Sequence, residues 1–173
     1  CLVGLVSSCN QPTKSLRNDS GKLEILFLGH NSEHHNSAQL LPLLASQLSL
    51  DGISFTYTSN PDDLNSENLD KYDALMIYAN HDSITTSQET ALLSFVEKGK
   101  GFIPVHCASW CFRNSPKYID LVGGQFSTHK TDSFTTEIIK KDHAITQGLQ
   151  PFATWDETYV HDKLASDLTI LME

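Results

Sequence analysis

Three short apolar segments of the chain each end in a histidine, and this pattern limits the folds open to it. The segments are LFLGH, ending at His30; IYANH, ending at His81; and IPVH, ending at His106. Short apolar runs without polar alternation are typical of strands buried on both faces of a parallel sheet. Helical patterns at 36–50 and 85–99 lie between these segments. The order strand, helix, strand predicts an α/β fold with a mainly parallel sheet.

Local signals place the other elements. We expect Ser37 to cap the first helix, and Thr86 to cap the second, which ends at Gly99. The remaining expectations are strands at 53–58 and 101–106, a polar linker or short helix near 62–72, a helical segment to about Val122, an edge strand at 134–140, and a strand at 167–173.

Composition narrows the class of protein. With 173 residues, of which 39% are hydrophobic, the chain can bury one core, so we expect one domain over 23–173. A formal net charge of −9 argues against nucleic acid and anionic lipid surfaces as partners. No run approaches the roughly 18 apolar residues of a membrane span.

The first 22 residues have a different character. An apolar run stops at Ser7-Ser8-Cys9 and is followed by a polar stretch. This order resembles a bacterial lipoprotein signal with Cys9 as the lipidated residue, followed by a flexible tether. It predicts export to the periplasm or anchoring at the outer membrane; the alternative is a frayed tail that carries a cysteine by chance.

The histidine-ending strands predict a common site. In open α/β sheets, ligands bind outside the carboxyl ends of the strands where strand order reverses, so His30, His81 and His106 would share one crevice. His34 and His35 follow the first strand closely. Each histidine alone has a plainer interpretation, as a hydrogen-bonded loop residue, but three equivalent positions favour a functional site.

A carboxylate would complete such a site, and the segment TWDETYVHD supplies it. Asp156, Glu157, Tyr159 and His161 lie in this short aromatic and acidic stretch. A carboxylate can orient an imidazole for acid–base chemistry or complete a metal site. The alternative is a loop that packs Trp155 against the core.

The turn after the strand at 101–106 resembles the elbow that carries the nucleophile in several hydrolytic folds, but it holds His106. Cys107 would point elsewhere, so nucleophilic activation of Cys107 or Ser109 is the less favoured alternative. Cys107 and Cys111 lack the spacing of redox or zinc motifs, and we expect small buried thiols.

Three motifs in order resemble the ThuA-like (trehalose-utilisation) domains. GKGFIPVHCAS is similar to their glycine-rich, histidine-containing signature, YIDLVGGQFSTH to a second segment, and DHAITQGLQPFATWDETY to a third. The resemblance covers most of 23–173. It implies by position that the following residues belong to the family's site: His34, His106, His129, Asp156, Glu157 and Tyr159.

The resemblance implies a flavodoxin-like three-layer sandwich of the class I glutamine amidotransferase-like type. Pro104, Cys107 and Ala144 depart from the family pattern, and none of these departures removes a chemically active group. The variant looks like exported members linked to disaccharide and keto-sugar metabolism, often fused to cytochrome, sugar-dehydrogenase or carbohydrate-binding domains. The abrupt end of the chain fits a fragment that is incomplete at the C-terminus.

Two functions from different classes remain. One is a sugar-processing hydrolase, lyase or isomerase, with His106, Glu157, Asp156 and Tyr159 as catalytic residues. The other is a non-catalytic carbohydrate-binding domain. Sugar contacts would come from a wider set: His30, His81, His129, Trp110 and Trp155. Glutamine amidotransferase activity is disfavoured, because the elbow lacks a nucleophile.

A divalent metal such as zinc is a further hypothesis for the same site. Its ligands would be His34, His106 and Glu157, with His129 or His81 as substitutes. No pair has the helical spacing of H-E-x-x-H, so convergence depends on the fold.

Overall fold

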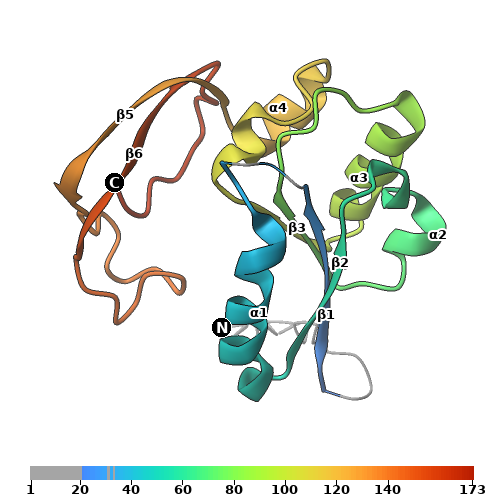
Figure 1. Ribbon diagram of the computed structural model, residues 1–173, viewed down its shortest axis with the longest axis horizontal. Coiled ribbons are helices and arrows are strands. Elements are labelled where there is room, and N and C mark those ends of the chain that lie inside the picture. Colours follow the sequence, from blue (N-terminus) through green and yellow to red (C-terminus); the bar gives the residue numbers. More distant parts are fainter. Residues whose placement is uncertain (1–20, 31, 33) are drawn as a thin grey trace, which may run out of the picture.

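The computed structural model describes residues 21–30, 32 and 34–173, and a four-stranded parallel sheet lies at its centre (Figure 1). The strands follow the order β2-β1-β3-β4. Their bounds are β1 (Leu23–Gly29), β2 (Ile53–Thr58), β3 (Ala74–Tyr78) and β4 (Gly101–Pro104). Every neighbouring pair is parallel, which confirms the predicted α/β fold.

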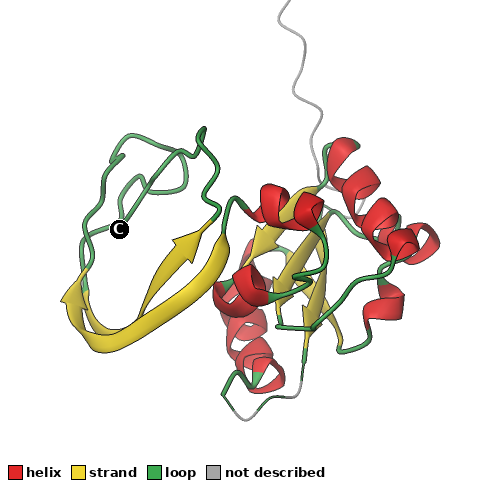
Figure 2. Cartoon of the chain, turned by 90° about the horizontal axis from the view of Figure 1, so that it is seen from above, coloured by secondary structure: helices red, strands yellow, loops and turns green. Residues whose placement is uncertain are grey.

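Helices cover both faces of the sheet and make three layers (Figure 2). Alternate residues of a strand point to opposite faces. On one face, Leu26 and Leu28 join a buried cluster with Leu92 and Phe95 of α3. The helices are α1 (Ser37–Leu48), α2 (Ser66–Leu69), α3 (Thr86–Glu97) and α4 (Pro116–Val122), with 3-10 turns at η1 (Ser49–Asp51), η2 (Pro61–Asp63) and η3 (His106–Trp110).

The turn after β4, η3, packs against α4. Tyr118 of α4 is almost wholly buried, and its hydroxyl donates to the carbonyl of Ala108 at 3.0 Å. Phe112 packs its ring against Tyr118, with 5.1 Å between ring centroids. The helical segment predicted to about Val122 is therefore two elements, η3 and α4. The hydrogen bond from Tyr118 of α4 to Ala108 of η3 holds η3 in place.

A long antiparallel hairpin projects from the sheet after α4 (Figure 1). It pairs β5 (Gln125–Thr135) with β6 (Ala153–Asp162), with a bulge between Phe126 and Thr128. Along β6, Glu157, Tyr159 and His161 are partly buried, while the residues between them are exposed. The aromatic and acidic segment is thus a strand whose partly buried face carries Glu157 and Tyr159.

Both predicted helix caps are displaced by one residue. The side chain of Asn36 accepts from the amide of Gln39, so Asn36 rather than Ser37 caps α1. Thr85 forms a capping box with Gln88 and begins α3. Ser37 is instead buried, and its hydroxyl donates to the carbonyl of His30 at 3.1 Å.

Two predicted strands near the end of the chain are wrong. The strand expected at 134–140 belongs mostly to a loop, because β5 ends at Thr135. Beyond it, the hydroxyl of Thr136 accepts from the amide of Phe152 at 3.0 Å, a bond that closes the hairpin ladder. The strand expected at 167–173 is reduced to a single bridge between Ile138 and Met172.

Candidate active site

The three strand-end histidines meet at one edge of the sheet, as predicted. His30 follows β1 and His81 lies three residues beyond β3, and their ring centroids are 5.9 Å apart. His106 follows β4, the next strand in the sheet. The carboxyl ends of adjacent parallel strands share an edge, which explains why segments far apart in sequence come together here.

His30 and His81 are nevertheless occupied with backbone groups. Nδ1 of His30 accepts from the amide of Asn80 at 3.3 Å, and Nε2–H of His81 donates to the carbonyl of Gly29 at 3.1 Å. Burial lowers the pKa of His30, and His81 and His35 lower it further. Neither imidazole lines the polar cavity next to Glu157, so their predicted role in substrate binding stays a prediction.

Close packing accounts for the glycine before His30. A Cβ atom on Gly29 would clash with Oγ of Ser37, the first residue of α1, and would lie 2.6 Å from Cε2 of Tyr57 on β2, closer than real Cβ atoms approach their neighbours. The absence of a side chain lets the start of α1 approach the end of β1. The loop that carries His34 and His35 therefore lies over the strand ends.

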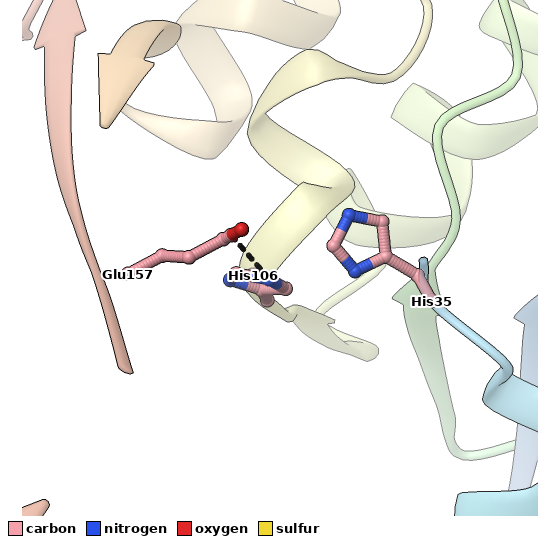
Figure 3. A group of neighbouring side chains, drawn as sticks. All are labelled: His35, His106 and Glu157. Atoms are coloured by element: carbon pink, nitrogen blue, oxygen red, sulfur yellow. Dashed lines mark ion pairs between the residues drawn. The ribbon is translucent and has the colours of Figure 1, made fainter. Parts of the chain in front are cut away.

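His106 occupies the elbow in a left-handed conformation, with φ of 50°. Its Nε2 lies 3.2 Å from the hydroxyl of Tyr159 and 3.3 Å from Oε2 of Glu157. Figure 3 shows Glu157 reaching from β6 toward His106, with His35 on the other side of the imidazole. Positive φ is uncommon outside glycine, and such residues concentrate at functional sites.

Glu157 lies between two imidazoles. Its other oxygen, Oε1, is 3.7 Å from Nδ1 of His129, which comes from β5 directly opposite Tyr159. Burial raises the pKa of the Tyr159 hydroxyl, and the charge of Glu157 raises it further. Tyr159 therefore keeps its proton at ordinary pH, and the tautomer of His106 determines which of the two groups donates in their contact.

A polar cavity of about 400 Å³ opens beside these groups. Its lining residues come from the strand-end loops, η3 and the hairpin: Ser32, His34, His35, Asn80, Cys107, Trp110, Phe126, His129, Glu157 and Tyr159. The structure thus brings His34, His129, Glu157 and Tyr159 to one cavity, and His106 contacts two of them, Glu157 and Tyr159. Trp110 is also at the cavity, whereas Trp155 is 72% exposed and does not line it.

Asp156 is separated from this cavity, because neighbouring residues of a strand point to opposite faces. Its Oδ1 accepts from the amide of Glu157 at 2.8 Å. It borders a second cavity of about 440 Å³, whose lining is mostly apolar and includes Phe27 and leucines of α1, and which His106 also lines. Its predicted catalytic role stays a prediction.

Three donor groups could hold a metal ion, and they differ from the predicted set by one residue. Ligand atoms of His35, His106 and Glu157 lie within 4.8 Å of one another. Zinc bonds of about 2.0–2.2 Å in tetrahedral geometry need donors about 3.4 Å apart, so small side-chain rotations would be required. His35 takes the place predicted for His34, which is exposed at the cavity rim.

Cys107 and Cys111 are free, buried thiols, as expected. Burial raises the pKa of Cys107 to about 12 and raises that of Cys111 as well. A thiol with so high a pKa is not a nucleophile near neutral pH. This environment argues against Cys107 as the nucleophile of an amidotransferase.

Two partners of the site were given no role from the sequence: Phe126, which was not named, and His161, which was named only as a member of the segment TWDETYVHD. Phe126 packs on Tyr159 with 4.4 Å between ring centroids, and His161 lies next to the elbow. The signal for His161 was available, because residues 157, 159 and 161 share one face if the segment is a strand. Over the described residues, no helix is both long and apolar enough to cross a membrane.

Comparisons with known proteins agree with this fold. A family model described as ThuA, trehalose utilisation, matches residues 24–173. A solved protein described as ThuA-like, from Bacteroides uniformis, has a TM-score of 0.74 and 19% identity over 87% of this chain and 66% of its own. A second solved protein described as ThuA-like, from Parabacteroides merdae, has a TM-score of 0.68 and 14% identity. The match covers 80% of this chain and 62% of the other.

The same architecture occurs in a protein with a different description. A glutamine amidotransferase from Thermotoga maritima has a TM-score of 0.53 and 12% identity, covering 87% of this chain and 66% of its own. At such identities the likeness concerns the fold alone. The chain spans less than two thirds of the length of the two ThuA-like structures, and no curated protein matches its sequence.

Proposed function

Because the chain belongs to the ThuA family, whose model matches it over 24–173, we propose that the polar cavity is the active site of a sugar-processing enzyme. The observation that carries this proposal is the contact of one imidazole nitrogen, Nε2 of His106, with both a carboxylate and a phenol. Glu157 lies 3.3 Å and Tyr159 3.2 Å from this atom, and both of these residues line the cavity of about 400 Å³.

The paired groups suit proton transfer next to a carbonyl. A base removes a proton from the carbon beside the carbonyl group of a keto-sugar, and an acid delivers a proton to the carbonyl oxygen. His106 and Glu157 can take these two roles because an imidazole can both accept and donate a proton, and the adjacent carboxylate stabilises the imidazolium. The resulting enediol can regain its proton on the other carbon, as in an isomerase, or expel a leaving group, as in a lyase.

The cavity also suits a polyhydroxylated ligand. The imidazoles, the amide of Asn80 and the hydroxyl of Tyr159 supply hydrogen-bonding groups. Trp110 supplies aromatic surface, and Cζ of Arg113 lies 3.8 Å from the centroid of its ring. Small-molecule sites commonly combine aromatic surface with a few convergent polar groups. The same features support the second candidate, a non-catalytic carbohydrate-binding domain, in which the histidines donate hydrogen bonds without proton transfer.

One experiment separates the two candidates. Purified protein is incubated with a panel of disaccharides, glycosides and their 3-keto derivatives, in deuterated water, and followed by NMR. The enzyme proposal expects turnover or deuterium incorporation that His106→Ala abolishes and Cys107→Ala leaves in place. Binding of a sugar without exchange or turnover, by wild type and His106→Ala alike, would establish the binding domain instead.

Export is a separate proposal and rests on the sequence around Cys9, which lies outside the described residues. Mass spectrometry of the native protein, extracted from membranes, is expected to find a diacylglyceryl group on an N-terminal Cys9. Soluble protein that retains residues 1–8 would contradict lipidation. Fused cytochrome, dehydrogenase or carbohydrate-binding domains stay predictions of the family resemblance.

A further inference from the structure

His161 holds a different part of the elbow from its neighbours on β6. Glu157 and Tyr159 contact the imidazole of His106, whereas Nε2 of His161 lies 3.2 Å from the hydroxyl oxygen of Ser109. Ser109 belongs to η3, three residues after His106, and is 8% exposed. Three alternate residues of one strand therefore contact a single turn of five residues.

The backbone of His106 needs such support. Its φ of 50° is unfavourable for a residue with a Cβ atom, and such conformations persist where the surrounding structure fixes them. The carbonyl of His106 accepts from the hydroxyl of Ser109 at 3.2 Å. This bond ties the strained residue to the far end of η3.

The number of available protons determines which group donates in the hydrogen bond between His161 and Ser109. A carbonyl can only accept, and a serine hydroxyl has one proton, which is used in the bond to His106. The Ser109 oxygen must then accept from His161, so His161 carries its proton on Nε2. A nucleophilic serine would need the opposite arrangement, with the serine proton shared with an unprotonated Nε2.

Burial favours a neutral His161. It lowers the pKa of this imidazole, although the nearby Asp162 partly opposes the shift. A neutral imidazole has one donor nitrogen and one acceptor nitrogen, so the bond to Ser109 selects one tautomer.

We propose that His161 and Ser109 are positioning residues that hold the left-handed backbone of His106 and thereby keep its imidazole in contact with Glu157 and Tyr159. The consequence for catalysis rests on the proposed function, in which His106 transfers protons. The structural part, a bond from Nε2–H of His161 to Ser109 and from Ser109 to the carbonyl of His106, is independent of any substrate.

The structural part is tested by nitrogen-15 NMR of the histidine rings in the whole chain at neutral pH. We expect His161 to be neutral with its proton on Nε2. In Ser109→Ala and His161→Phe, the ring signals of His106 should shift or split into more than one state. His161→Gln, whose amide can donate from the same place, should restore a single wild-type-like state. A proton on Nδ1 of His161, or unchanged His106 signals in both disruptive variants, would overturn the proposal.

The catalytic part is tested by kinetics on a sugar that the wild type turns over. Ser109→Ala and His161→Phe should lower kcat by about 10²-fold with little change in KM, because misplacing a reacting group by about 1 Å has effects of this size. His161→Gln should stay within about threefold of wild type. Val160→Ala, on the exposed face of the same strand, is the matched control for disturbance of the hairpin.

The two parts fail in distinguishable ways. If no sugar is turned over but the NMR results hold, the proposed enzyme function fails and the positioning of His106 stands. If kcat is unchanged in both Ser109→Ala and His161→Phe, the positioning role is wrong and the proposed enzyme function still stands. Circular dichroism identifies a variant that is unfolded, and Ser109→Ala, which removes only one oxygen atom, then carries the test.

Discussion

The imidazole of His106 lies nearly parallel to the phenol ring of Tyr159, with 4.5 Å between ring centroids and 28° between ring planes. The two residues are 53 positions apart in sequence, and their contact fastens the hairpin to the end of the sheet. The stacking fixes the plane of the imidazole, while the hydroxyl of Tyr159 meets its Nε2. One side chain thus supplies both orientation and a hydrogen bond.

Tyr159→Phe separates these two contributions. The variant keeps the ring contact but loses the hydroxyl that contacts Nε2 of His106. Turnover should fall about five- to tenfold, in line with a net hydrogen-bond contribution of about 1 kcal/mol, and the melting temperature should change little. Tyr159→Ala also removes the stacking and should be far less active. Equal activity of the wild type and Tyr159→Phe would assign the phenol a packing role only.

Glu157→Gln tests the carboxylate. It preserves the shape of the side chain but removes the charge beside the two imidazoles, so activity should fall by about 10²- to 10⁴-fold, as for loss of an acid–base group. The free energy of unfolding should change by less than about 1 kcal/mol, because this ion pair is partly exposed to solvent. Chemical denaturation measures the second quantity.

Two carboxylates on the exposed face of the hairpin serve as comparisons. Asp156→Asn should have a much smaller effect than Glu157→Gln, because Asp156 bonds to a backbone amide and borders the apolar cavity. Asp132 lies opposite Asp156 and accepts from the amide of Ser133 at 2.7 Å, so Asp132→Asn is the matched control. A larger loss in Asp156→Asn than in Glu157→Gln would reverse the two assignments.

Zinc binding can be measured without a substrate. Protein freed of metal by chelation should take up close to one equivalent of zinc in calorimetry, through His35, His106 and Glu157. His35→Ala should weaken binding at least tenfold. His34→Ala alters the neighbouring histidine, which lies outside this cluster, and should bind zinc as the wild type does. If the native protein binds no zinc, the imidazoles serve as acid–base or sugar-binding groups.

The parallel sheet and the shared edge of His30, His81 and His106 could be predicted because both depend on local patterns. An apolar run bounded by turn residues specifies a buried strand, and parallel strands leave their carboxyl ends together. The order β2-β1-β3-β4 then brings His106 next to the other two. The loops beyond the strand ends are less constrained by their own sequence.

The contents of the site depended on packing that no local pattern encodes. His34 and His35 are adjacent and chemically identical, and the loop between β1 and α1 determines that His35 packs on His106, with 4.8 Å between ring centroids. The segment around Glu157 was ambiguous between loop and strand. Only its pairing with β5, in which Thr131 lies opposite Glu157, sets which residues face His106.

Acid sensitivity is expected from the buried histidines. Burial lowers the pKa of His30, and the neighbouring His81 and His35 lower it further. In the unfolded chain, an imidazole has its ordinary pKa of about 6.5. Below about pH 6.5 the unfolded chain therefore binds a proton at this position before the folded protein does, and the free energy of unfolding falls with pH. Above that pH His30 is neutral in both states and has no such effect.

His30→Asn tests this linkage. The oxygen of asparagine can replace Nδ1 as the acceptor for the amide of Asn80, so the fold should be retained. Urea denaturation at pH 5, 6 and 7 should show that this variant loses less stability on acidification than the wild type. The matched control is His143→Asn, since Nδ1 of His143 also accepts a backbone amide, that of Ile145 at 3.2 Å. If the free energy of unfolding depends on pH as steeply in His30→Asn as in His143→Asn, the acid sensitivity originates elsewhere. His35 and His161 are then the next residues to replace, because burial lowers the pKa of both.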